Sequence, residues 1–135
     1  MDAAELQAFM ARDFPQVADD FRVEHVDEAG VRVRLLVAAR HLRPGGTVSG
    51  PSMFALADVG LYLAILSRLG PVALAVTTNC AIDFMRKPEA GRDLIGQARI
   101  LKLGRVLAVG DVVLYSDGRP DPVARAGLTY SIPQK

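Results

Sequence analysis

The fold is decided by residues 49–69, which read SGPSMFALADVGLYLAILSRL. A small polar residue followed closely by proline is typical of a helix start. The backbone N–H groups of the first turn have no partner within the helix, so proline, which has no N–H, costs no hydrogen bond there. The residues that follow are apolar on nearly all sides, whereas a surface helix keeps a polar face. We therefore predict a buried central helix over residues 50–69, about 30 Å long.

The interior of this helix contains one charged side chain, Asp58. Burying an ionised carboxylate without partners costs several kcal/mol. Asp58 is therefore expected either to have specific hydrogen-bond partners or to line a hydrated cavity. If this chain performs chemistry, we expect it there.

Composition limits the class of protein. The 135 residues suffice for one domain with a single core, and a hydrophobic content of 50% favours burial against another copy of the chain. A net charge of +1 gives no support for a nucleic-acid partner. One cysteine, Cys80, cannot form an internal disulfide, which indicates a reducing cytoplasm. The N-terminus has no signal-peptide pattern, and the apolar run around Asp58 is too short to span a membrane, so we expect a soluble protein with no membrane partner.

The remaining sequence predicts a helical segment in residues 1–20 and a set of strands. Alternating apolar and polar residues predict a hairpin at residues 21–26 and 31–37. Four more strands are expected at residues 73–85, 94–103, 106–115 and 123–132, and we expect them to form an antiparallel meander. A curved antiparallel sheet wrapped around the helix would cover most of its sides, leaving an open flank for a second copy. The sequence thus predicts a single α+β domain over residues 1–135.

Several short motifs add a family resemblance. Leu56-Ala57-Asp58 follows Ser49-Gly50-Pro51 at a helix start, and residues 83–88 read Asp-Phe-Met-Arg-Lys-Pro. With the Gly104-Arg105 turn, this set resembles hotdog-fold acyl-CoA thioesterases of the PaaI type, in which an acid stands nine residues after the histidine of a His-Gly-Gly. That motif is Ser-Gly-Pro in this chain. The resemblance covers residues 21–132 and implies the hotdog fold, a curved sheet around one long helix.

The resemblance also implies residue roles. It gives Asp58 the role of general base or nucleophile, and the Gly50 N–H that of donor to the thioester carbonyl oxygen. Thr77 stands where relatives hold the attacking water with a serine, and Arg43 where they position the substrate carbonyl with an asparagine. Ser49 is either a helix cap or a substrate contact. No metal is expected, and coenzyme A enters only as part of the substrate.

Further candidates come from position and charge. Phosphates of coenzyme A require nearby cations, whereas solvated charge is the ordinary role of cations at strand ends. His41, beside the loop that precedes the helix, is a marginal candidate for the imidazole that is absent at position 49. The candidates for substrate and coenzyme A binding are Ser49, Arg43, Asn79, Arg86, Lys87, Lys102 and Arg105.

The resulting hypothesis is an acyl-CoA thioesterase, with the acyl group running along the apolar helix. Asp58 lies about two turns from Gly50, so one helix cannot present both groups to one thioester. We therefore predict a site shared between subunits of a dimer or a dimer of dimers. One alternative is a non-catalytic hotdog protein that binds acyl-CoA or another small ligand. A hotdog dehydratase or hydratase is a weaker alternative, because such enzymes usually pair a histidine with an acid and neither histidine is suitably spaced from Asp58.

Overall fold

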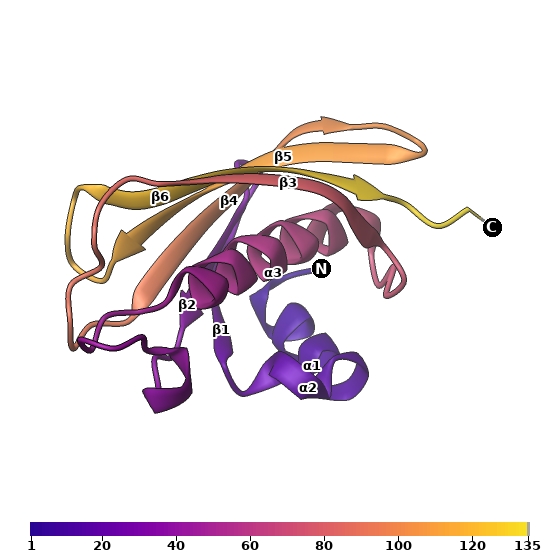
Figure 1. Cartoon of the computed structure of the whole chain (residues 1–135). Helices are drawn as coiled ribbons and strands as arrows, with labels where there is room; N and C mark the ends of the chain where they lie inside the picture. The colour runs from indigo at the N-terminus through magenta and orange to yellow at the C-terminus, as the bar shows by residue number, and fades with distance from the viewer. Residues whose placement is uncertain (135) are drawn as a thin grey trace.

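The computed structural model describes residues 1–134 and contains a six-stranded antiparallel sheet curved around one long helix (Figure 1). The predicted α+β arrangement is thereby confirmed. The helices are α1 (Ala3–Asp13), α2 (Pro15–Ala18) and α3 (Gly50–Leu69), with a 3₁₀ turn at Ala39–His41. The strands are β1 (Phe21–Val26), β2 (Val31–Leu35), β3 (Val76–Phe84), β4 (Leu94–Leu103), β5 (Leu107–Ser116) and β6 (Pro122–Ser131).

The strand order is β1-β2-β4-β5-β6-β3, which differs from the expected meander. The β1–β2 hairpin and the run β4–β5–β6 are as predicted, but β3 pairs with β6 at the far edge of the sheet and not with β4. The prediction of four consecutive paired strands is therefore wrong for β3. Alternation of apolar and polar residues sets the face that a strand buries, not its neighbour. Residues 85–93 carry the chain across the intervening strands to β4, which pairs with β2.

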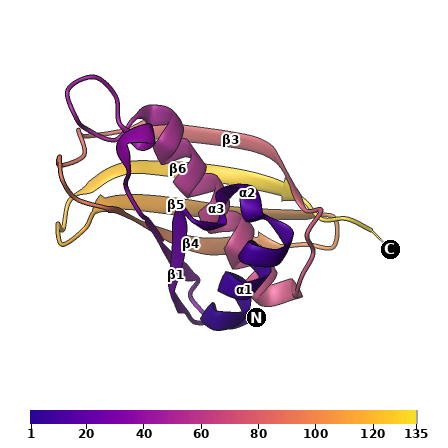
Figure 2. The same cartoon turned by 90° about the horizontal axis from the view of Figure 1, so that it is seen from below.

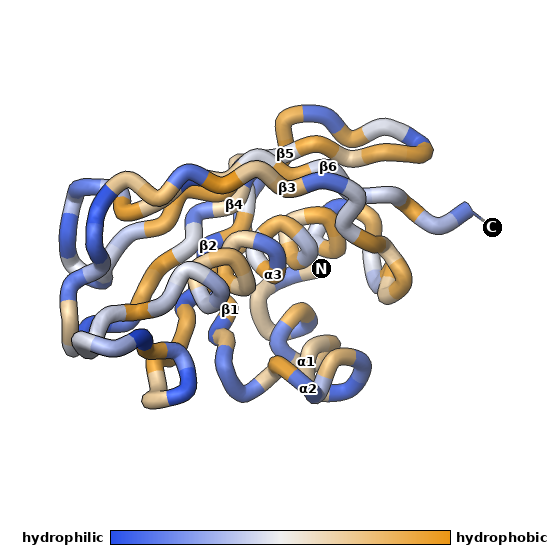
Figure 3. The backbone as a smooth tube through the Cα atoms, in the orientation of Figure 1, coloured by the Kyte–Doolittle hydropathy of each residue, from blue (hydrophilic) through white to orange (hydrophobic). Residues whose placement is uncertain are grey.

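Helix α3 lies along the concave side of the sheet, and apolar residues follow it almost throughout (Figure 3). It has the length and hydropathy of a membrane-spanning helix, but 61% of its most apolar window is buried, and it is the core helix of this fold. Gly110 of β5 allows close approach at this contact. A Cβ at Gly110 would lie 2.4 Å from Leu61 Cδ1 and 2.5 Å from the Arg99 carbonyl oxygen.

The N-terminal helices lie beside the C-terminal half of α3, as the view from below shows (Figure 2). Helix α1 buries Leu6, Phe9 and Met10 against the core. Gln7 ties α1 to β1, because its side-chain amide accepts the Val23 N–H (2.9 Å) and donates to the Phe21 carbonyl oxygen (3.2 Å). These contacts fix the position of the junction between α1 and α2.

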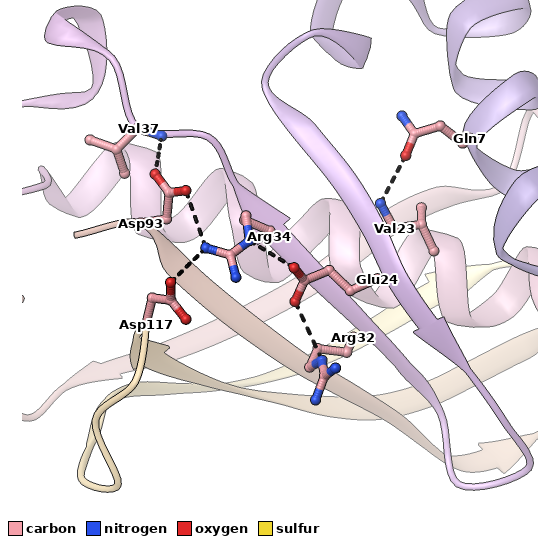
Figure 4. A network of polar contacts seen from close by, with 8 residues as sticks. All are labelled: Gln7, Val23, Glu24, Arg32, Arg34, Val37, Asp93 and Asp117. Carbon is pink, nitrogen blue, oxygen red and sulfur yellow. Dashed lines mark hydrogen bonds and ion pairs between the residues drawn. The ribbon is translucent and has the colours of Figure 1, made fainter.

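An ionic network braces the sheet (Figure 4). The Arg34 guanidinium donates to Glu24 (2.7 Å), Asp117 (2.8 Å) and Asp93 (3.2 Å), and Asp93 also accepts the Val37 N–H (2.9 Å). Hydrogen bonding from Arg34 lowers the pKa of Asp117. The network joins β1, β2, the start of β4 and the turn after β5, and so holds the sheet together at that end.

Candidate active site

Asp58 is held through one of its two carboxylate oxygens. Its Oδ1 accepts hydrogen bonds from Thr77 Oγ1 (2.6 Å) and from the Tyr130 hydroxyl (2.6 Å). Oδ2 makes no hydrogen bond to any of residues 1–134, and no side-chain oxygen or nitrogen in that part of the chain is both buried and unpaired. Oδ2 is therefore open to solvent, so a substrate or a water molecule can reach it.

The pairing of β3 with β6 explains why both donors meet one carboxylate. Thr77 and Tyr130 are cross-strand partners, and a β-bulge follows immediately between Thr77 and Asn79. Directly opposed side chains in an antiparallel pair lie about 5 Å apart on the same face. The sheet thus presents two hydroxyls side by side to the turn of α3 that carries Asp58.

Tyr130 is a site residue that the sequence did not reveal. It is 3% exposed, and burial, with a further contribution from the Asp58 carboxylate, raises the pKa of its hydroxyl far above the ordinary value of 10. The phenol therefore remains a protonated donor at neutral pH. The available signal was weak: a buried tyrosine usually needs a partner for its hydroxyl, but the sequence alone does not say which.

A cleft of about 410 Å³ opens beside Asp58. Asp58, Thr77 and Tyr130 line it together with Tyr62, which lies one turn further along α3, and Phe14 from the junction of α1 and α2. The Tyr62 hydroxyl donates to the Ala73 carbonyl oxygen (2.9 Å) and is therefore not directed at Asp58. The cleft combines one open carboxylate oxygen with a mixed lining of aromatic, aliphatic and polar side chains.

A second cleft, of about 360 Å³, lies at the N-terminus of α3 and is lined by Gly50 and by the cations Arg43, Arg86 and Lys87. The Gly50 N–H has no hydrogen-bond partner among residues 1–134. Ser49 acts here as the helix cap, since its Oγ accepts the Ser52 N–H (3.3 Å). Gly50 and Asp58 are eight residues apart, about 12 Å along the helix axis. One chain therefore holds the two groups in separate clefts.

The other candidates lie outside these two clefts. Asn79 is exposed on β3 beside the bulge. Lys102 and Arg105 lie where β4 meets β5, at the end of the sheet opposite Arg86 and Lys87. His41 is buried, with Nδ1 accepting the Ala38 N–H (2.9 Å) and Nε2 3.4 Å from an Asp20 carboxylate oxygen, so its ring is directed away from both clefts.

Comparison with known proteins identifies the family. The family model described as "Thioesterase superfamily" matches residues 45–123, more than half of the chain, including α3 with Asp58 and Gly50. The chain belongs to the thioesterase superfamily. The predicted resemblance is thereby confirmed at the level of the family, and the substrate is not part of that match.

Individual relatives agree. A solved "putative thioesterase" from Silicibacter sp. TM1040 is 58% identical, with a TM-score of 0.93 over 99% of this chain and 93% of that one. The phenylacetic acid degradation protein PaaI of Thermus thermophilus, solved as a mutant, is 31% identical, with a TM-score of 0.74 over 88% of this chain and 99% of that one. A Pseudomonas aeruginosa "putative esterase" is 33% identical over 101 residues, 75% of this chain and 74% of that protein.

Proposed function

We propose that this protein hydrolyses acyl-CoA thioesters at a site built from two copies of the chain. One copy contributes Asp58 with Thr77 and Tyr130, and the other contributes Gly50. Membership of the thioesterase superfamily supports a thioester hydrolase. The proposal of a site shared between two copies depends on one observation, the separation of two groups along α3. The open carboxylate oxygen of Asp58 lies in one cleft, and the Gly50 N–H, which has no partner among residues 1–134, lies in the other.

The chemistry follows from these two groups. Asp58 Oδ2 either takes a proton from water, whose oxygen then bonds to the carbonyl carbon, or itself attacks that carbon to give an anhydride that water later opens. In both routes the carbon–sulfur bond breaks and coenzyme A leaves as a thiol. In the first route its sulfur takes the proton that Asp58 removed from water, and in the second it takes a proton from water directly. The carbonyl oxygen gains negative charge during attack, which the Gly50 N–H stabilises at the positive end of the helix dipole. Thr77 and Tyr130 hold Oδ1, so that Oδ2 remains turned toward the cleft.

The edge strand supplies a way to bring the two halves together. β3 is the last strand of the sheet, so one of its edges is unpaired, and Val76, Phe84 and Met85 on and just after it are exposed. Unpaired apolar edges of this kind favour pairing with another chain. A hollow of about 440 Å³ between β3 and the first turn of α3, lined by Phe54, Ile82 and Phe84, adds apolar surface to bury.

The register within one chain makes this pairing specific. A Cβ at Gly50 would lie 3.5 Å from the Phe84 ring, whereas Asp58 is bonded to Thr77 near the other end of the same strand. Antiparallel pairing of β3 with its own copy about a two-fold axis puts the Phe84 end of one strand beside the Thr77 end of the other. Gly50 of one copy thereby approaches Asp58 of its partner, and Arg43, Arg86 and Lys87 accompany Gly50 as cations for the coenzyme A phosphates.

The test is a thiol-release assay on short, medium and aromatic acyl-CoAs with wild type and the Asp58→Asn variant. Loss of a base or nucleophile lowers kcat by about 10² or more, while the unfolding midpoint stays near that of wild type. Asp111→Asn is the matched control, because Asp111 pairs with Arg99 on another strand and lines neither cleft. Unchanged turnover in Asp58→Asn would contradict the proposed catalytic role of Asp58. Binding without turnover in wild type would favour the alternative of an acyl-CoA-binding protein.

A further inference from the structure

The cleft beside Asp58 extends along α3 toward the junction of α1 and α2. Asp58 and Tyr62 both line it and are one helical turn apart, about 5 Å along α3. The Tyr62 ring meets the Phe14 ring edge-on, with centroids 6.0 Å apart. Phe14 also lines the cleft, with its neighbours Asp13 and Gln16. From the open oxygen of Asp58 the cleft therefore runs along the helix to Tyr62 and then meets the N-terminal segment at Phe14.

The walls along this path suit an apolar group. Val59 and Ala75 lie beside the aromatic rings of Tyr62 and Phe14. The polar atom that Tyr62 carries is already engaged with the Ala73 carbonyl oxygen. An apolar chain beside Val59, Ala75 and the two rings loses contact with water while the Tyr62 hydroxyl keeps its partner. The polar Asp13 and Gln16 lie at the Phe14 end of the cleft.

Phe14 is fixed where it meets the cleft. Its N–H closes α1 on the Met10 carbonyl oxygen (2.9 Å), and Pro15 begins α2 directly afterwards. The two hydrogen bonds of Gln7 to β1 anchor α1 to the sheet. These contacts hold the backbone at this junction, and the edge-on contact with the Tyr62 ring orients the Phe14 side chain, so its ring forms a wall of the cleft.

We infer that Phe14 is a specificity-determining residue, the end wall that limits the length of the acyl group. Short and medium acyl groups fit between Asp58 and the Phe14 ring, and long chains collide with it. This inference rests on the proposed function, in which the thioester carbonyl lies at Asp58. The inference assigns the selection of acyl-chain length to the N-terminal segment around Phe14, which lies outside α3 and the sheet.

The test uses S-butyl-, S-octyl- and S-dodecyl-CoA, thioethers that bind without being hydrolysed, and measures their Kd values by calorimetry. Wild type is expected to bind S-octyl-CoA at least tenfold more tightly than S-dodecyl-CoA. Removing the ring in Phe14→Ala opens space for further methylenes, so binding of S-dodecyl-CoA tightens by about tenfold or more relative to S-butyl-CoA. Phe14→Leu gives a smaller shift in the same direction and serves if the alanine variant does not fold.

Val17→Ala is the matched control, because Val17 belongs to the short helix α2 that begins directly after Phe14 and packs against the core but does not line the cleft. Its length preference should equal that of wild type. The inference is overturned if the Phe14 variants keep the wild-type ratios, if wild type binds S-dodecyl-CoA as tightly as S-octyl-CoA, or if no thioether binds. Turnover of the corresponding thioesters is measured separately. If the Phe14 variants shift the length preference but wild type hydrolyses none of the thioesters, the proposed hydrolase activity is refuted, while the role of Phe14 as the end wall is supported.

Discussion

The hydroxyl of Tyr130 provides the sharpest single-atom perturbation of the site. The Tyr130→Phe variant removes one oxygen, which lies 2.6 Å from Asp58 Oδ1, and keeps the buried ring. Thr77 still donates to the same carboxylate oxygen at 2.6 Å, so Asp58 is not left without a partner. The change therefore weakens the hydrogen bonding that positions the Asp58 carboxylate but leaves the carboxylate itself in place.

The expected magnitude follows from the type of bond. A hydrogen bond to a charged group contributes about 1.5–3 kcal/mol, and part of that remains through Thr77. If half of it is lost in the transition state, kcat falls by roughly four- to thirteenfold. The KM should change little, because the hydroxyl points at Asp58 and not along the apolar walls.

Tyr62→Phe is the matched control for this experiment. It removes a hydroxyl from the same cleft, one helical turn away, but that hydroxyl donates to the Ala73 carbonyl oxygen and not to Asp58. The assay is steady-state thiol release across pH, with both variants checked by thermal unfolding. A kcat equal to that of wild type in Tyr130→Phe, or equal losses in both variants, would refute a positioning role for Tyr130.

Three further predictions concern stability and association. Gly110→Ala should lower the free energy of unfolding by about 2 kcal/mol in urea titrations, because its Cβ would lie 2.5 Å from a backbone oxygen, whereas Gly127→Ala, with nothing within 4 Å, should change it little. Arg34→Met should lower the thermal midpoint at neutral pH by roughly 5 °C. Hydrogen bonding from Arg34 lowers the pKa of Asp117 below its ordinary 3.8. The stability that Asp117 contributes through Arg34 is therefore fully present above pH 3.8 and is lost as the pH falls below it. Calorimetry should show the difference in thermal midpoint between Arg34→Met and wild type becoming smaller in that acidic range. Phe84→Asp should shift the mass measured by light scattering toward the 14.5 kDa of one chain, with a matching loss of turnover; an unchanged mass would place the interface elsewhere.

The central helix and its charged residue were predictable because their signals are local. A run apolar on nearly all sides has to be buried, and an acid within it requires partners; α3 and the two hydroxyls at Asp58 fit both expectations. The cap at Ser49 was one of two open interpretations, and the helix start alone favoured it. Such inferences need only the periodicity of one element and the cost of burying a charge.

Features that depend on which strands meet were not predictable in the same way. The position of β3 at the sheet edge follows from the route of residues 85–93, which alternation does not encode. Tyr130 enters the site only because β6 pairs with β3 in the register that puts it opposite Thr77. Thr77 itself came from family resemblance. For the same reason Lys102 and Arg86 looked equivalent as strand-end cations, although they lie at opposite ends of the sheet.

The central claim, a site shared between two copies, is tested most directly by mixing two inactive variants. Asp58→Asn lacks the carboxylate, and Gly50→Val blocks the approach to the N–H. After the two are unfolded together and refolded, a mixed dimer has one site in which both residues are intact and one in which both are changed. Random pairing then restores about a quarter of wild-type turnover in a two-fold dimer. Recovery to that level would support the shared site. No recovery, with mixed dimers demonstrated by mass spectrometry, would contradict it.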